Sequence, residues 1–344
     1  MHRSPGLYSA TVLVALIGGG AAAHALSIID TFGSSVTSNA NVSQIEASIQ
    51  SASNAIAALY SNPVTVTIDF ELTNQGLGGS SQYLYAASYA NYTQALKNNS
   101  IANAGNTPLA SAVANLSKGN DATVRVPVVL TSALVDALGL GNISAGGTVY
   151  LNNSLIYFGT GSTPSNLYSG TGVIQHEIDE ILGGGGAGSV LGSSLQNSYV
   201  GALDLYRYTG TGVPSYTTSK LASSYFSIDG GKTLLARFNQ TGVGDYGDFY
   251  GTTLIQNYAA YPGHTPEPFA GSLESTMLQA IGYDLAPAAT SSFKTARSLL
   301  GSSAEINPAP QPTLGAGLAS LAFLAAAGAV ARMRERRRPA FRAG

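Results

Sequence analysis

The sequence predicts an α+β domain in which a twisted sheet supports one helix that carries the chemistry. Helical and strand patterns follow one another in mixed order from about residue 42 to residue 158, which favours this class over an all-α or all-β fold. A second observation is the apolar-spaced stretch at residues 173–182, which ends in four consecutive glycines. The third is size, because a 344-residue chain with 44% hydrophobic residues suffices for one large domain or two small ones.

Hydrophobic spacing places the elements in order along the chain. Apolar residues at helical spacing predict helices at residues 42–60, 81–96, 109–116, 131–138 and 272–283. Alternating patterns predict strands at residues 64–72, 124–130 and 148–158. The second of these is expected at a sheet edge, because Pro127 has no N–H for a ladder, and the third includes a strand or a hairpin that turns at Asn152-Asn153. Beyond residue 186 the chain is rich in loops.

Both ends of the chain have the composition of targeting segments. Residues 1–25 have a basic start, an apolar run and the cleavage-type sequence Ala23-His24-Ala25, which predicts a secretory signal peptide. Residues 286–312 form an Ala/Ser/Pro linker, and residues 313–344 hold an apolar run, long enough to span a bilayer, before an Arg-rich end. We therefore expect an exported protein, extracellular or at the cell surface, whose domain covers residues 26–285.

The C-terminal order of Pro-rich segment, apolar helix and Arg cluster resembles the PEP-CTERM sorting signal of exported bacterial proteins, with Ala309 at the position of the family's Glu. The resemblance implies recognition by exosortase-type sorting machinery, followed by removal of the tail. A permanent transmembrane anchor is the alternative, which would leave the protein attached to the membrane through this segment.

Composition excludes several classes of function. Cysteine is absent, so the chain has no disulfides, no thiolate metal site and no Cys nucleophile. Seven of the sixteen basic residues lie in the two targeting segments, which leaves nine against seventeen acids and a net charge near −8 for the body. Nucleic-acid binding is not expected of such a surface.

The helix at residues 173–182 holds the strongest chemical signal. His176 and Glu180 are four residues apart and therefore lie on one helix face, where two ligands on adjacent turns can hold one cation. Glu177 follows the first ligand, as the general base does in His-Glu-x-x-His zinc proteases, although here Glu180 stands in place of the second His.

The plainer interpretation is a solvated acidic face beside a core histidine. Against it, three acids fall within four positions of a chain that is only 10% charged, and no Lys or Arg lies three or four residues away to compensate them. Asp179 points away from the face of His176 and Glu180, so we place it outside the site.

Taken together, residues 170–285 resemble secreted bacterial metalloproteases of metzincin-like type. The shared stretches, in the family's order, are His176–Gly183, Asp204–Tyr208, Phe226–Gly231, Gly244–Phe249 and Met277–Asp284. The resemblance implies a metzincin-like zinc protease fold with a loop-rich C-terminal subdomain at residues 166–285, after an N-terminal part at residues 26–165. It also implies His176, Glu180 and Asp248 as ligands, Glu177 as general base, and Zn²⁺ as the metal, with Mn²⁺ or Ca²⁺ as alternatives because two ligands are carboxylates.

Other residues remain open as ligands or neighbours of the site. Asp204 beside Arg207 is more simply an Asp–Arg clasp, and His264 lies in a Pro-flanked loop. Asp245 is either an outer partner of the ligands or a turn former. Tyr246 or Tyr250, two residues on either side of the expected ligand Asp248, is the candidate for the group that stabilises an oxyanion.

Two functions follow as hypotheses. The first is a secreted or cell-surface metal-dependent endopeptidase acting on protein or peptide substrates through an activated water. The alternative is a non-catalytic envelope or matrix binding protein that retains the same fold.

Overall fold

The computed structural model describes residues 25–116, 126–251, 253–266 and 272–286, and the backbone of 320–321 and 330–333. The helices are α1 Ser34–Thr37, α2 Val42–Ala57, α3 Tyr89–Ala102, α4 Thr107–Asn115, α5 Ser132–Ala137, α6 Gly170–Leu182 and α7 Leu273–Ile281, with 3₁₀ turns η2 Gly185–Gly188 and η3 Leu203–Tyr206. The strands are β1 Ser27–Phe32, β2 Thr65–Thr73, β3 Gly78–Ala87, β4 Val128–Thr131, β5 Ala145–Asn152, β6 Ile156–Tyr157, β7 Tyr168–Ser169, β8 Val200–Gly201, β9 Arg207–Gly210, β10 Val213–Pro214, β11 Tyr225–Phe226, β12 Ala236–Arg237, β13 Ser320–Leu321 and β14 Val330–Met333.

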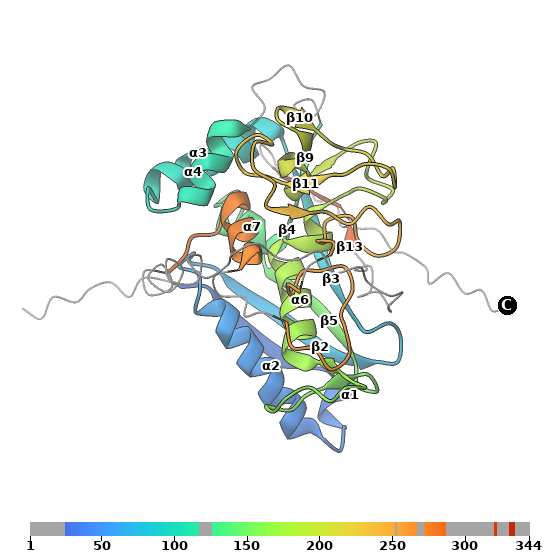
Figure 1. Cartoon of the computed structure of the whole chain (residues 1–344). Coiled ribbons are helices and arrows are strands. Elements are labelled where there is room, and N and C mark those ends of the chain that lie inside the picture. Colours follow the sequence, from blue (N-terminus) through green and yellow to red (C-terminus); the bar gives the residue numbers. More distant parts are fainter. Residues whose placement is uncertain are drawn as a thin grey trace, which may run out of the picture.

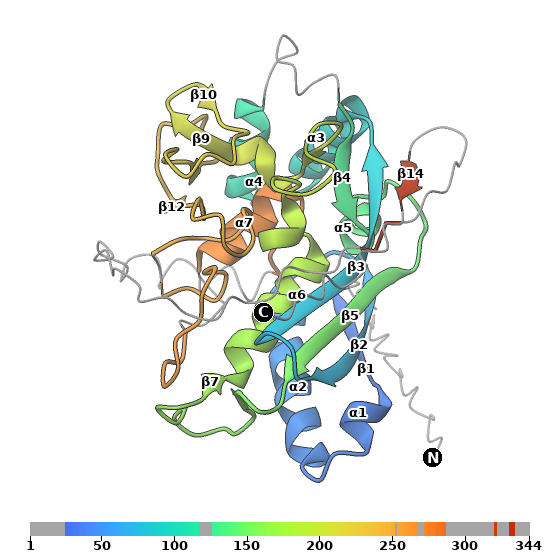
Figure 2. The same cartoon turned by 90° about the vertical axis from the view of Figure 1, so that its right-hand side faces the viewer.

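The main sheet is mixed, which confirms the α+β class. Strands β1, β2 and β5 run parallel, and β3 joins β5 in antiparallel register from Gly78 opposite Leu151 to Gln82 opposite Gly147. Helices α2 and α6 pack together on one face of this sheet (Figure 1), while the strands lie side by side in the order β1-β2-β5-β3 (Figure 2). Strand β2 alternates accordingly, with Val66, Ile68 and Phe70 buried and Thr65 and Thr67 exposed.

Most predicted elements are present. The helices expected at 42–60, 109–116, 131–138 and 272–283 correspond to α2, α4, α5 and α7, and the strand at 64–72 is β2. Thr131 caps α5 as expected, since its hydroxyl accepts a hydrogen bond from the amide of Leu134. The edge strand is β4, which is shorter than predicted and pairs in parallel with β8.

One local prediction is wrong, and one of two alternatives for the third strand is not realised, for the same physical reason. Residues 81–87 belong to strand β3 rather than to a helix, and the helix that follows begins only after Ser88, whose side chain caps α3. Residues 148–152 belong to strand β5, which confirms the strand predicted there. The alternative of a hairpin that turns at Asn152-Asn153 is not formed, because β2 and β3 already pair with both edges of β5, and β6 pairs with β7. In both cases tertiary pairing overrides a local pattern that permits either structure.

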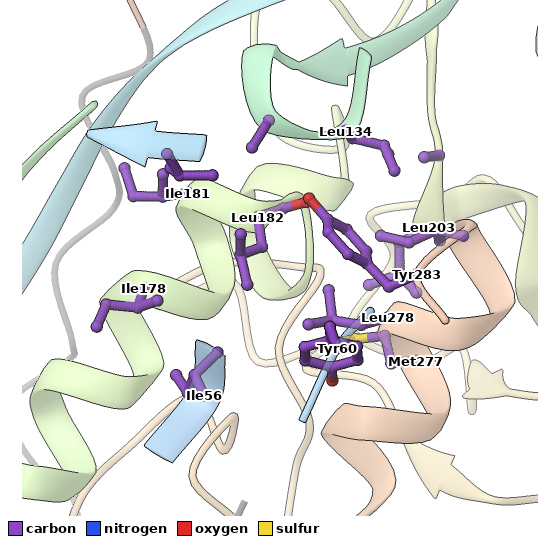
Figure 3. Close-up of a cluster of buried hydrophobic side chains, with 14 of the residues drawn as sticks. Ile56, Tyr60, Leu134, Ile178, Ile181, Leu182, Leu203, Met277, Leu278 and Tyr283 are labelled. Atoms are coloured by element: carbon purple, nitrogen blue, oxygen red, sulfur yellow. The ribbon is translucent and has the colours of Figure 1, made fainter. Parts of the chain in front are cut away.

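One part of the hydrophobic core lies between α6, α7 and the segment around Tyr60 (Figure 3). Tyr283 reaches α6 from the end of the domain, where its hydroxyl donates to the carbonyl oxygen of Leu182 at 3.0 Å. Tyr60 and Tyr283 pack edge to face with ring centroids 5.5 Å apart. The end of the domain thus holds the end of the central helix.

The part after α6 is dominated by loops around the small sheet β10-β9-β11-β12, as predicted (Figure 2). Among the described residues, no helix is both long and apolar enough to cross a membrane. The predicted signal peptide at 1–25 (apart from residue 25), the linker at 286–312 (apart from residue 286) and most of the segment at 313–344 lie outside the described residues.

Candidate metal centre

Helix α6 has well-defined ends, which fix the direction of its side chains. The Ser169 hydroxyl accepts from the amide of Gly172 at 3.3 Å and caps the start. At the other end Gly183 takes a left-handed conformation (φ 103°), and the amide of Gly184 donates to the carbonyl oxygen of Asp179 at 2.9 Å. This is a Schellman-type stop, so the glycines end the helix as the sequence predicted.

The three predicted ligands converge in one place. His176 Nε2 lies 3.8 Å from Glu180 Oε1 and 3.9 Å from Asp248 Oδ2, and one ligand atom from each residue falls within 4.8 Å of the others. Atoms that bind one cation at 2.0–2.4 Å in tetrahedral geometry lie roughly 3.3–3.9 Å apart. The three side chains are at most 1% exposed. Helix α6 supplies two of them, and the loop before Phe249 supplies the third.

The imidazole of His176 is oriented to present a lone pair to this group. Its Nδ1 lies 2.9 Å from the carbonyl oxygen of Ile255, which can only accept, so Nδ1 carries the proton. Burial lowers the pKa of His176 to about 4, against the opposing effect of that hydrogen bond. The ring is therefore neutral at neutral pH, and its contacts with Glu180 and Asp248 are not ion pairs. Nε2 and the carboxylate oxygens face one another as lone pairs, an arrangement that a cation satisfies.

Glu180 and Asp248 are positioned by further contacts. Ser80 Oγ donates to Glu180 Oε2 at 2.5 Å, and the amide of Gly186 donates to Oε1 at 3.2 Å. Asp248 accepts a hydrogen bond at Oδ1 from Gln256 Nε2 at 3.0 Å, while Oδ2, the atom that faces His176, has no hydrogen-bond partner. The donor set of one imidazole nitrogen and two carboxylate oxygens fits Zn²⁺ and also the harder divalent cations.

Glu177 lies beside the ligands, beneath strand β3. It is fully buried, and neither carboxylate oxygen has a hydrogen-bond partner. A Cβ at Gly78 would come within 2.6 Å of Glu177 Oε1, so the strand can pass this close only because that residue is glycine. Burial raises the pKa of Glu177 well above its ordinary value, and the charges of Glu180 and Asp245 raise it further.

The surroundings of the group are acidic and contain little compensating positive charge. The carboxylates of Glu177, Asp179, Glu180 and Asp248 are at most 1% exposed, and burial raises the pKa of each well above its usual range. The plainer interpretation of the helix as a solvated acidic face is therefore wrong. Buried carboxylates require protons or a cation.

Asp204 is engaged in a different cluster. Its carboxylate accepts hydrogen bonds from the hydroxyl of Ser189 at 2.6 Å and from the amides of Val190 and Gly201 at 3.0 and 2.9 Å. The charge of Arg207 favours its ionised form, although burial has the larger effect and raises the pKa. In the described part of the chain Arg207 donates to Tyr246 O at 2.5 Å and Gln240 Oε1 at 2.6 Å, with no direct Asp204 ion pair.

The other candidates lie around the group without joining it. Asp245 is half-buried, and its charge raises the pKa of Glu180 and of Asp248. The hydroxyl of Tyr246 donates to the carbonyl oxygen of Thr218 at 3.3 Å. His264 lines a pocket near the first turn of α6 together with Gly172 and Pro266. Tyr250 stacks on Tyr258 with centroids 5.6 Å apart.

Sequence reasoning missed Ser80, Gln256 and Gly185. Gln256 is fully buried, and its Nε2 lies 3.3 Å from His176 Nε2 as well as 3.0 Å from Asp248 Oδ1. A Cβ at Gly185, where φ is 47°, would come within 1.9 Å of that nitrogen. The glycine run is a visible signal for close approach, whereas nothing in the local sequence marks Ser80 or Gln256.

Comparison of the chain with family models, curated proteins and solved structures returns no match.

Proposed function

We propose that this protein is a metal-dependent endopeptidase. His176, Glu180 and Asp248 would hold one divalent cation, and Glu177 would act as general base. The observation that carries the proposal is the convergence of three ligand atoms within 4.8 Å beside a buried carboxylate whose oxygens accept no hydrogen bond. A base that accepts a proton from water needs such a free oxygen.

The chemistry divides between the cation and the side chains. Zn²⁺, or Mn²⁺ or Ca²⁺ in its place, would supply a Lewis acid that polarises the scissile carbonyl and lowers the pKa of water. Glu177 takes the proton of the attacking water on its carboxylate and passes it to the leaving amine. Ser80 and the amide of Gly186 hold Glu180, and the carbonyl of Ile255 keeps the proton of His176 on Nδ1.

The topology supports the finer proposal of a metzincin-like fold. The candidate helix α6 packs under a mixed sheet in which β3 is the antiparallel member nearest the site. Within that proposal the substrates are proteins or peptides, and the chain is exported with the help of the two terminal segments. Sorting by an exosortase-type enzyme, or anchoring through the C-terminal segment, belongs to the same proposal.

The first test is Glu177→Gln. This substitution removes the base while leaving the three ligands, so we expect cleavage of an unstructured protein to fall by at least about a hundredfold with the bound metal retained. Asp179→Asn is the matched control, since it neutralises a buried acid on the same helix outside the ligand group. Glu177→Gln with undiminished, chelator-sensitive cleavage would refute the role of Glu177.

The alternative is a non-catalytic envelope or matrix protein with a structural cation. It is favoured by one observation, the burial of every ligand side chain to 1% exposure or less. That alternative predicts a parent protein that binds the cation and cleaves no unstructured protein, in which Glu177→Gln changes nothing measurable.

A further inference from the structure

Gln256 occupies a position that the proposed chemistry leaves unexplained. Its side-chain nitrogen is within hydrogen-bond distance of both His176 Nε2 and Asp248 Oδ1, whereas its oxygen Oε1 is buried without a hydrogen-bond partner. A buried carboxamide oxygen without a partner is unfavourable, because it has lost its hydrogen bonds to water. Such an oxygen therefore indicates a missing partner.

The backbone of Gln256 is held from two sides. Its amide donates to Glu274 Oε1 at 2.9 Å, and its carbonyl oxygen accepts from the amide of Phe249 at 2.8 Å. The absence of a side chain at Gly185 lets the carboxamide reach the ligand group. The fold thus places the Gln256 carboxamide beside two ligand atoms, His176 Nε2 and Asp248 Oδ1. A site with three protein ligands does not need this contact.

A bound cation would change which end of the Gln256 carboxamide is favourable beside the ligand atoms. Once His176 Nε2 uses its lone pair to bind a cation, it can no longer accept a hydrogen bond from Gln256. The two ends of a carboxamide have nearly the same shape, so a half-turn exchanges Nε2 for Oε1 within the same space. Amide oxygens are ordinary neutral ligands of Ca²⁺ and related hard cations.

We infer that Gln256 is a fourth ligand, which binds the cation of the proposed metal site through Oε1. The inference rests on the proposed function, which supplies the cation. It adds a way in which access of water to that cation is regulated. Three protein ligands leave a position for water, whereas four close the site. Gln256 bound through Oε1 closes the site, and Gln256 turned away opens it to water.

The test uses Mn²⁺ as the probe on the full chain, with water-proton relaxation to count exchanging waters on the bound ion. Gln256→Ala should show one more water per bound Mn²⁺ than the parent and an affinity lower on the order of tenfold. Gln256→Glu, which keeps a ligand oxygen in place, should show the parent's number of waters. Gln279→Ala is the control, because Gln279 is a buried amide that donates to Ser275 O within α7.

The outcomes separate the two proposals. Parent-like water count and affinity in Gln256→Ala would overturn the fourth ligand and leave the metal site standing. If Gln256→Ala does not fold by circular dichroism, an extra water in Gln256→Glu overturns it. A parent that binds neither Mn²⁺ nor Zn²⁺, or whose binding survives His176→Ala, would overturn the metal site and with it the role of Gln256.

Discussion

Two clusters of buried carboxylates lie within this domain, one around Asp204 and the other formed by Glu177, Glu180 and Asp248. They differ in the hydrogen bonds that they accept. Asp204 accepts three hydrogen bonds from Ser189, Val190 and Gly201, and the charge of Arg207 lies close enough to favour its ionised form. Glu177 accepts none, Asp248 accepts one at Oδ1, and Glu180 accepts two, from Ser80 and from the amide of Gly186. Both clusters are equally buried.

The difference shows what each cluster is for. A carboxylate surrounded by donors is complete within the protein, so Asp204 fixes a loop and needs no cation. The oxygen Oδ2 of Asp248, which lies 3.9 Å from the neutral imidazole of His176, has no donor, and a cation would satisfy it. Substitutions in the Asp204 cluster should therefore lower the stability whether or not metal is present. Substitutions in the cluster of His176, Glu180 and Asp248 should change the stabilisation that added metal gives.

The largest effect is expected from Asp204→Ala. It removes three hydrogen bonds and the charge of Asp204 that favours the buried, ionised Arg207, so we expect a loss of about 3 kcal/mol in the free energy of unfolding, with or without metal. Urea denaturation measures it, and Asp136→Ala, at a half-buried acid on α5, is the control. An unchanged stability together with lost metal would instead make Asp204 a ligand.

The second prediction concerns the other cluster. Zn²⁺ at a free concentration a hundredfold above its dissociation constant should raise the free energy of unfolding by about 2.7 kcal/mol, because it binds only the folded chain. Asp248→Ala should lose most of this gain, whereas Asp204→Ala should keep it. Thermal denaturation with and without Zn²⁺ gives the comparison, and an equal gain in Asp248→Ala would exclude Asp248 as a ligand.

Gly185→Ala tests the link between the glycine run and the ligand group. The left-handed backbone costs an alanine about 1–2 kcal/mol, and the new Cβ would also displace Gln256 and so weaken cation binding. Gly139→Ala is a matched control, since Gly139 is also left-handed (φ 63°) but faces open space. Calorimetric titration should show weaker binding only in Gly185→Ala; equal affinities would mean that the amide does not touch the site.

The smallest effect is expected at Asp229, a partly exposed acid that four protein donors satisfy without any cation. The hydrogen bonds from Thr233, Ser227 and the amide of Lys232 lower its pKa despite the opposing effect of burial. A lowered folded-state pKa gives stability that is present above the unfolded pKa and lost as pH falls through the folded one.

Asp229→Ala should therefore lower the free energy of unfolding at pH 7 by only a few tenths of a kcal/mol, because solvent screens this partly exposed carboxylate. The difference from the parent should shrink as the pH falls from the unfolded pKa of about 3.9 through the lower folded pKa. Urea denaturation across this pH range measures the difference. A gap that persists at acid pH would mean that packing, and not the carboxylate, accounts for it.

The sequence predicts helix α6 well because its signals are local. Apolar spacing and a stopping Gly183 act within a few residues, and His176 and Glu180 follow from helix geometry alone. The helix begins at Gly170, after the Ser169 cap, three residues before its predicted start. The sequence does not reveal strand β3, because residues 83–87 are apolar at every position and show no period, and the pairing of residues 78–82 with β5 is visible only in three dimensions.

Local signals and long-range contacts differ in the same way within the candidate metal site. Asp248 was predicted from a family resemblance, and its position next to His176 could not be derived from spacing. Ser80 lies 100 residues before the Glu180 that it holds, and Gln256 lies 80 residues after His176. Contacts of this range depend on the completed fold, so no local pattern predicts them.

The last residues of the domain, 283–286, contact the segment at residues 59–61 near its beginning and the end of α6. Residues 284 and 286 exchange backbone hydrogen bonds with Ser61 and Leu59, and Tyr283 holds the last turn of α6. During synthesis these residues emerge after every candidate ligand, so the contacts that hold the last turn of α6 form only once the whole domain has been made. A cation at the proposed site would therefore bind in the compartment in which the finished chain folds, and the supply there would decide which metal occupies the site.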